Sequence, residues 1–267
     1  MPTRQFSERT EVPPGKPKVS IMQLKTLRKR IDSCALAALC VISSTMLSWC
    51  GTLTVSPVRI QVSTSRPNAT LQIVNREDEP VTVQLHIVTW SFNGQNDVLA
   101  DSDEVMLNPP IAVVAGRHAQ AIRLGLRKPN DSLQECCYRL IIEEVPPAPK
   151  PNFVGIRTIV KLSIPIFVSP KTAISPRLSW QAVRTSDSRV TLIATNQGSA
   201  HIQIRAMDVT GTDPAQPYLK GVPPTYILPN QQREWVIEDQ RALVESRMKV
   251  TGVTDAGALH ETIEIVR

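Results

Sequence analysis

The chain has 267 residues, of which 30 are Lys or Arg and 24 are Asp or Glu, so its formal net charge is +6. That length exceeds the roughly 100–200 residues of a single domain and favours two domains. A hydrophobic content of 42% excludes global disorder. The sequence has no uninterrupted apolar run of about 18 residues, which excludes a polytopic membrane protein.

Residues 1–50 are expected to be an N-terminal extension and a signal peptide. A basic cluster, Lys25 and Arg28–Arg30, precedes an apolar stretch from Cys34 to Trp49, which is the order of a secretory signal. Met22 is an alternative start, and cleavage is expected near Cys50. That cysteine also leaves open an alternative in which the protein is anchored by a lipid.

Subtracting this leader changes the meaning of the charge. Residues 1–50 hold 8 basic and 3 acidic side chains, which leaves 22 basic and 21 acidic side chains and a net charge of +1. A basic nucleic-acid-binding face is therefore not expected. Three of the five cysteines also lie in the leader, and only Cys136 and Cys137 follow it.

Beyond the leader, short segments of period-two hydrophobicity alternate with Pro, Asn, Asp and Gly, which is typical of β-strands. No stretch of about 12 residues has helical periodicity with caps. The expected strands are Thr52–Val62, Ala69–Val74, Val81–Trp90, Gln120–Leu126, Tyr138–Val145, Phe153–Val168, Leu178–Val183, Val190–Thr195, His201–Val209, Arg233–Glu238, Met248–Thr254 and Leu259–Val266. We predict an all-β fold.

The strand pattern breaks near Pro170. It predicts an N-terminal domain at 51–169 and a C-terminal domain at 170–267, each matching the roughly 100 residues of an immunoglobulin-like β-sandwich. Cys136 and Cys137 are adjacent, and a bridge between neighbours requires a strained ring. We expect free thiols in a strand. A vicinal redox switch and a bridge between molecules are the alternatives.

Motifs for several kinds of chemistry are missing from the sequence. There is no glycine-rich phosphate loop, no Cys-x-x-Cys and no His-Glu-x-x-His. The four histidines are scattered without the spacing of metal ligands, and each is interpreted as a surface or strand residue. We therefore predict no catalytic residues, no metal, no cofactor and no small-molecule substrate.

A series of short motifs resembles the periplasmic chaperones that assemble pili in the chaperone–usher pathway. In chain order the motifs are Val55–Arg59, Val74-Asn75, Pro109-Pro110, Ala115-Gly116, Gln120–Leu124, Tyr138–Leu140, Glu144–Pro147 and Val160–Val168. The resemblance covers nearly all of 52–267 and is stronger in the first half.

The resemblance implies that the protein binds, folds and caps pilus subunits by donor-strand complementation and delivers them to an outer-membrane usher. A subunit is a sandwich that lacks a strand, and the chaperone lends one of its own. The expected donor is Phe153–Val160, with Val154 and Ile156 as donor side chains, Asn152 before them and Thr158 after them. Without the resemblance, Val154 and Ile156 would be interpreted as ordinary core residues of the last strand of the first domain.

The resemblance also assigns Arg59 and Lys161 to the cleft between the domains, where the family's two basic residues bind the C-terminal carboxylate of the subunit. Glu135 and Asp255 match the acidic positions of an interdomain charge cluster in the family. Pro165 stands where the cluster has its basic residue, so the cluster looks incomplete and that salt bridge is not predicted.

The implied partners are pilus subunits and an outer-membrane usher, and the implied location is the periplasm. The main alternative is a structural or adhesive exported β-sandwich protein. A pilus subunit is expected to carry its own N-terminal donor extension, and the strand pattern that starts after Gly51 leaves no room for one. A periplasmic hydrolase, the third alternative, has no motif in its favour.

Overall fold

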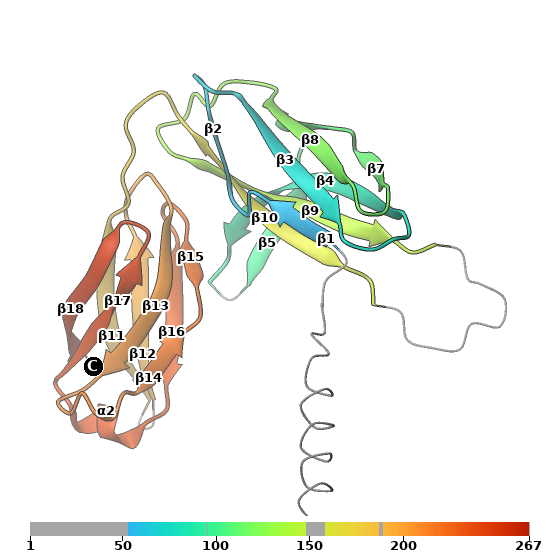
Figure 1. Cartoon of the computed structure of the whole chain (residues 1–267). Coiled ribbons are helices and arrows are strands. Elements are labelled where there is room, and N and C mark those ends of the chain that lie inside the picture. Colours follow the sequence, from blue (N-terminus) through green and yellow to red (C-terminus); the bar gives the residue numbers. More distant parts are fainter. Residues whose placement is uncertain (1–52, 95, 148–157, 187–188, 267) are drawn as a thin grey trace, which may run out of the picture. The chain divides into compact units, whose positions relative to one another are not determined.

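The computed structural model describes residues 53–94, 96–147, 158–186 and 189–266. The leader, the alternative start at Met22 and Cys50 lie outside them. Strands dominate the described residues and form two β-sandwiches in tandem, which confirms the all-β, two-sandwich prediction (Figure 1). Both sandwiches belong to one compact unit, Gly51–Arg267.

The first sandwich contains two sheets. Sheet A has the order β1-β3-β8-β6, and sheet B has the order β2-β10-β9-β4-β5, with β7 paired to β4. The strands are β1 (Leu53–Ser56), β2 (Ile60–Ser63), β3 (Asn68–Asn75), β4 (Val81–Phe92), β5 (Asp97–Asp101), β6 (Val105–Asn108), β7 (Ile111–Val114), β8 (Ala119–Leu126), β9 (Cys136–Val145) and β10 (Lys161–Ser169).

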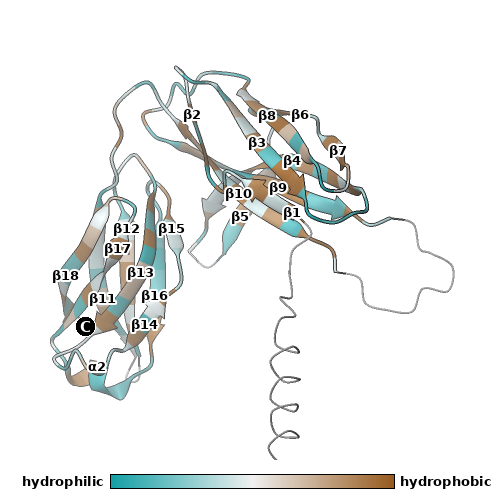
Figure 2. Ribbon diagram, in the orientation of Figure 1, coloured by the Kyte–Doolittle hydropathy of each residue, from teal (hydrophilic) through white to brown (hydrophobic). Residues whose placement is uncertain are grey.

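Alternating side chains build the core of this sandwich. In β4, Val83, Leu85 and Ile87 are buried in the core, whereas the residues between them are less buried. Figure 2 shows that hydrophobic and hydrophilic residues are interspersed along the strands of both sandwiches. The same period of two places Ile164, Ile166 and Val168 of β10 in that core. At about 25 cal/mol for each square ångström of apolar surface removed from water, such a cluster is the main source of stability.

The expected strand Thr52–Val62 is two strands in the structure. β1 pairs antiparallel with β3 in sheet A, whereas β2 pairs in parallel with β10 in sheet B, where Ile60 is opposite Ile166. Pro57 lies between β1 and β2 and has no backbone N–H to give to a ladder, so the pairing stops there. The chain thereby crosses from one sheet to the other just before Arg59.

The second sandwich also has two layers. One layer contains β14, β13, β17 and β18, with β15 paired to β13, and the other contains β11, β12 and β16. A short pairing of β18 with β11 joins the two layers into one continuous sheet. The elements are β11 (Leu178–Ser186), β12 (Arg189–Asn196), β13 (Ile202–Thr210), β14 (Leu219–Val222), β15 (Thr225–Ile227), β16 (Gln232–Ile237), the helix α2 (Gln240–Val244), β17 (Arg247–Thr254) and β18 (Gly257–Val266). Its separate core includes Leu192, Ile204 and Val250.

Three buried asparagines hold loops in both sandwiches by the same pattern. Asn75, Asn130 and Asn196 each accept a hydrogen bond from the backbone N–H two residues later and donate to the carbonyl four residues later. Each also donates to a carbonyl more than 30 residues away, at Val114, Val168 and Ile227 respectively. The amides thus satisfy backbone groups that water cannot reach.

Among the described residues, no helix has the length and apolarity needed to cross a membrane.

Candidate functional site

Arg59 lies directly before β2 and points away from the core of the first sandwich. Its neighbour Ile60 is buried in that core, so alternation along the chain directs the Arg59 side chain to the opposite face. Its Nη1 donates to Oδ2 of Asp255, which follows β17 in the second sandwich, at 2.9 Å. The side chains are only 30% and 15% exposed, so this ion pair is partly shielded from water.

Lys161 is the first residue of β10 and stands opposite Glu143 of β9. The Nζ of Lys161 lies 2.5 Å from Oε1 of Glu143. The hydrogen bond from Lys161 and its positive charge lower the pKa of the Glu143 carboxyl. Both side chains are exposed, so the pair contributes little to the stability of the fold. It places the ammonium group of Lys161 beside Glu143 of β9.

Arg59 lies directly before β2, Lys161 begins the adjacent β10, and both side chains are directed to the face of sheet B that points away from the core. We call this the outer face of sheet B, and it also carries Cys137, Arg139 and Phe167. Because Ile60 is opposite Ile166, the backbones of Arg59 and Lys161 are offset by four residues, or about 13 Å along the sheet. Each cation has its own carboxylate, Asp255 for Arg59 and Glu143 for Lys161.

An aromatic cluster also forms on the outer face. The Phe167 ring is fully buried and stacks on the His201 ring with 3.4 Å between centroids. Trp90 of β4 and Tyr226 of β15 lie 6.1 and 5.5 Å from the Phe167 ring. Residues of both sandwiches therefore share this small apolar cluster, which Leu228 completes.

Two groups of charges accompany the aromatic cluster. In one, Asp97 pairs with Arg139 at 3.5 Å and with Arg233 at 2.9 Å, and burial lowers the pKa of Arg139. In the other, His201 Nδ1 lies 2.5 Å from Oε2 of Glu135, and both side chains are buried. Glu135 and Asp255, which were matched to an incomplete charge cluster, lie on either side of His201, whose Nε2 is 3.8 Å from Oδ2 of Asp255.

His201 is one residue whose position sequence reasoning missed. A lone histidine at the start of a strand reads as a surface or strand residue, yet His201 precedes β13 and is 8% exposed. The absence of a basic residue at Pro165 was the only available signal, because a buried Glu135 needs a donor from elsewhere. Pro165 itself is buried in β10 opposite Arg139.

Comparison with known proteins finds a family model that matches the first sandwich. Residues 52–173 match the family model described as pili and flagellar-assembly chaperone, PapD N-terminal domain. This part of the chain is similar to the N-terminal domain of that chaperone family, over less than half of the whole chain. The PapD-type sandwich therefore contains Arg59 and Lys161, and the match ends within the segment that leads to β11. Among curated proteins, none matches the chain in sequence.

Solved structures share the fold of both sandwiches. A chain of the CsuC–CsuE chaperone–tip adhesion subunit pre-assembly complex of Acinetobacter baumannii has a TM-score of 0.60 at 21% identity, covering 81% of this chain and 99% of that one. The Escherichia coli chaperone DraB has a TM-score of 0.53 at 18% identity, covering 79% and 94%. A chain of the Salmonella enterica SafA pilin complex with the SafB chaperone has a TM-score of 0.55 at 15% sequence identity. That alignment covers 79% of this chain and 94% of that one.

The expected donor segment of the PapD-type sandwich lies mostly outside the described residues. Asn152, Val154 and Ile156 fall there, and Thr158 is described as exposed and outside any strand. The ladder with β9 begins just before Lys161, where Glu144 N donates to the Val160 carbonyl at 3.0 Å. Val160 N in turn donates to Oε2 of Glu144 at 3.2 Å.

Cys136 and Cys137 are both free and point to opposite faces of β9. Cys136 packs against the core of the PapD-type sandwich, whereas Cys137 packs against the aromatic cluster around Phe167. Burial, followed by the negative charge of Glu135, raises the pKa of the Cys137 thiol. Free thiols in a strand were expected. Their opposite orientation is inconsistent with joint action of the two sulfurs.

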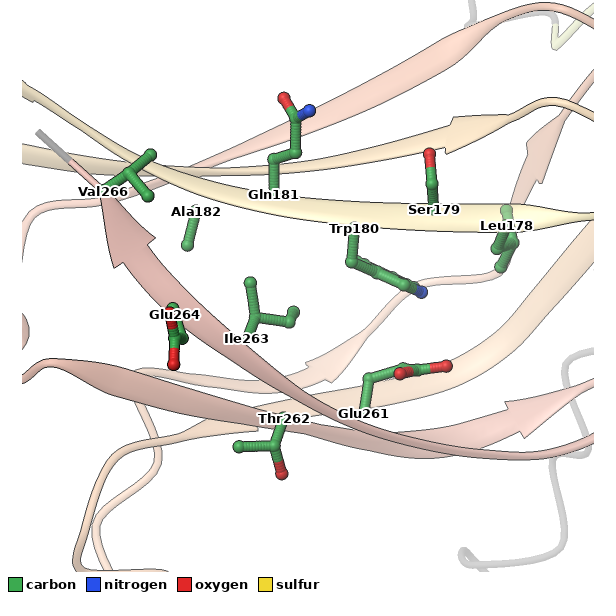
Figure 3. A pocket seen from close by; sticks show the side chains of 10 residues that line it. All are labelled: Leu178, Ser179, Trp180, Gln181, Ala182, Glu261, Thr262, Ile263, Glu264 and Val266. Carbon is green, nitrogen blue, oxygen red and sulfur yellow. The ribbon is translucent and has the colours of Figure 1, made fainter.

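A groove lies in the second sandwich (Figure 3). β11 and β18 pair only at Ala182–Ile265 and Val183–Val266 and then diverge, which opens a groove of about 510 Å³. Trp180 and Ile263 point into the space between the strands. No predicted site residue lines the groove. Among the described residues, no three His, Cys, Asp or Glu side chains cluster as metal ligands would.

Proposed function

We propose that this protein is a periplasmic chaperone that binds, folds and caps pilus subunits by donor-strand complementation and delivers them to an outer-membrane usher. The observation that carries the proposal is the placement of Arg59 and Lys161. Both are directed to the outer face of sheet B, Arg59 directly before β2 and Lys161 at the start of the adjacent β10, in a sandwich that matches the chaperone family model.

The two cations suit a carboxylate. An arginine offers a planar fork of N–H donors, and a lysine offers a compact point charge. A chain terminus bound between them would exchange the partners that they have now, Asp255 and Glu143, for its own carboxylate. Charge-assisted hydrogen bonds of this kind are about twice as strong as neutral ones, so the terminus would fix the register of the bound strand.

Strand donation then follows from sheet geometry. In the proposal, one face of an extended donor segment enters the groove of the subunit. The residues of that face are Asn152, Val154, Ile156 and Thr158. Main-chain hydrogen bonds would supply affinity, and alternate side chains would enter pockets. The segment runs directly into Lys161, so anchoring the terminus at that lysine would place the subunit strand beside the donor.

Co-production in a periplasm tests the anchor. The full chain would be produced with tagged candidate pilus subunits, and the complex recovered through the tag. We expect a 1:1 complex that is lost in Arg59→Ala or Lys161→Ala. Matched controls are Arg117→Ala and Lys171→Ala, which remove the same charges from the exposed pairs with Asp78 and Asp131. Equal capture by all four variants would refute the anchor.

A second pair of changes tests the donor. Val154→Asp with Ile156→Asp should abolish capture while circular dichroism and thermal unfolding remain those of the unmodified protein. Val244→Asp is the control, because Val244 is 88% exposed in α2. Collapse of the fold in the double variant would instead show that Val154 and Ile156 are core residues.

A further inference from the structure

The imidazole of His201 is held between two carboxylates. On one side, Oε2 of Glu135 lies 2.5 Å from Nδ1 and also accepts the backbone N–H of His201 at 2.9 Å. On the other side, Nε2 lies 3.8 Å from Oδ2 of Asp255. The His201 side chain is 7% exposed, so it is largely shielded from water between these two carboxylates.

The contacts fix which nitrogen carries the proton of the neutral ring. Ionised Glu135 can only accept, so Nδ1 donates to it and Nε2 presents its lone pair toward Asp255. A separation of 3.8 Å is too long for a hydrogen bond. A neutral His201 therefore has no attractive contact with Asp255 through Nε2.

The oxygen of Asp255 that faces His201 is the one that binds Arg59. Oδ2 accepts from Arg59 Nη1 at 2.9 Å, while Oδ1 accepts the backbone N–H of Gln203 at 2.8 Å. Protonation at Nε2 would turn a lone pair into a cationic donor aimed at Oδ2. His201 and Arg59 would then compete for one oxygen and repel one another as like charges.

The other charged and titratable groups around the ring allow this competition. Phe167 stacks on the imidazole, and Tyr226 lies 5.7 Å from its centroid. Burial raises the pKa of Tyr226, which therefore stays neutral, and this tyrosine also shares a side-chain hydrogen bond with Arg59. The Cys137 thiol beside Glu135 also stays neutral, because burial raises its pKa. Arg66 lines the adjoining cavity of about 240 Å³.

We propose that Asp255 positions Arg59 and that protonation of His201 draws Asp255 away, so that Arg59 becomes available to a subunit carboxylate as the pH falls. The inference rests on the proposed function of Arg59 as an anchor. Histidine is suited to this role because it ordinarily changes charge between about pH 5 and 8. The effect is a coupling between a proton site and a binding site.

Paired peptides measure the coupling. The probes are a soluble peptide in which Val alternates with Thr or Ser, with a free C-terminal carboxylate, and the same peptide ending in an amide. Their affinities would be measured at pH 8 and pH 6 for the protein purified from a periplasm. The ratio of carboxylate to amide affinity isolates the anchor, because strand pairing is common to both peptides.

We expect this ratio to rise by about fivefold or more from pH 8 to pH 6 in the unmodified protein. In His201→Gln it should not change with pH. In Asp255→Asn the affinity ratio should be high at both pH values, because Arg59 has lost its counter-ion. The coupling is refuted if the carboxylate-to-amide affinity ratio of the unmodified protein exceeds one but does not change with pH. It is also refuted if the ratio still changes with pH in His201→Gln. A ratio of one throughout overturns the anchor itself, and the coupling with it.

A measurement on the unmodified protein guards against a variant that fails to fold. The side-chain nitrogen shifts of His201 and Arg59 would be followed by NMR from pH 8 to pH 5.5. The Arg59 signals should move in step with the titration of the His201 ring. Arg59 signals that stay constant while His201 titrates would rule out the competition for Asp255.

Discussion

Asp255 of the second sandwich binds Arg59 of the first, with 2.9 Å between Oδ2 and Nη1. The two residues are 196 positions apart, so only the folded chain brings them together. The backbone of Asp255 is itself fixed, because its N–H donates to the Gln203 carbonyl at 3.0 Å. Arg59 is therefore held at a defined position rather than extended freely into solvent.

The Arg59–Asp255 pair should contribute modestly to stability. In a double-mutant cycle of Arg59→Ala and Asp255→Ala, we expect a coupling of about 1 kcal/mol, since the pair is only partly buried. Urea unfolding followed by tryptophan fluorescence measures it. The same cycle with Arg117 and Asp78, an exposed pair, should give a smaller coupling. A larger coupling for the exposed pair would contradict the role of burial.

Phe167→Ala should destabilise the protein by about 3–5 kcal/mol, because it removes a fully buried ring and leaves a cavity. The loss includes its stacking on His201 and its contacts with Trp90 and Tyr226. Thermal unfolding checks the prediction. Phe167→Leu fills part of the space and should cost less, so equal losses in the two variants would argue against a packing role.

Gly116→Ala should be severe, costing about 3 kcal/mol, because overpacking displaces backbone. An added Cβ would lie 1.8 Å from the carbonyl oxygen of Asp78. Gly94→Ala is the control, with nothing within 4 Å of the new carbon but a φ of +98°. The control should cost about 1 kcal/mol from backbone strain alone. Similar melting temperatures for both variants would refute the steric explanation.

Cys137 should resist modification in the folded protein. Burial raises its thiol pKa, so the fraction of reactive thiolate at pH 8 is very small. An Ellman assay should count Cys137 only after unfolding, and Cys137→Ala should leave the native count unchanged. Because the folded pKa is raised, the stabilising contribution is complete below the ordinary thiol pKa near 8.5 and is lost as pH rises above it. Fast native labelling of Cys137 would disprove this.

Asn196→Ala should cost about 3 kcal/mol, since it leaves two buried carbonyls without a donor. Asn196→Asp should be no better at neutral pH. It keeps the acceptor for Gly198 N but places a carboxylate oxygen against the carbonyls of Ala200 and Ile227. Denaturant midpoints for the two variants decide whether the donor or the acceptor matters. An unchanged midpoint in the aspartate variant would contradict the assignment.

Period-two hydrophobicity was sufficient to predict most of the long strands. β4 and β9 were expected nearly as they occur, because alternating residues such as Leu85 and Leu140 must face a core. The short edge strands β5 and β7 were missed. All side chains of β5 are exposed, so hydrophobic burial leaves no period there to detect. The helix α2 was missed as well, because five residues are too few for a helical period.

Sequence analysis predicted only part of the candidate site. Arg59 and Lys161 were found by resemblance to the family, and their role as anchors stays a prediction. The position of His201 between Glu135 and Asp255 was not foreseen. The partner of a buried carboxylate is chosen by proximity in space, and His201 is 66 positions from Glu135.

The sequence by itself determined the all-β fold and two sandwiches, because alternation of side chains is a local property of each strand. It also showed that most of the net charge lies in residues 1–50, so that the +6 of the whole chain becomes +1 after residue 50. Tertiary structure alone decided which charges meet. Arg59 pairs with Asp255, and His201 lies between Glu135 and Asp255. Long-range pairing depends on how sheets and sandwiches pack, and no local pattern in the chain records it.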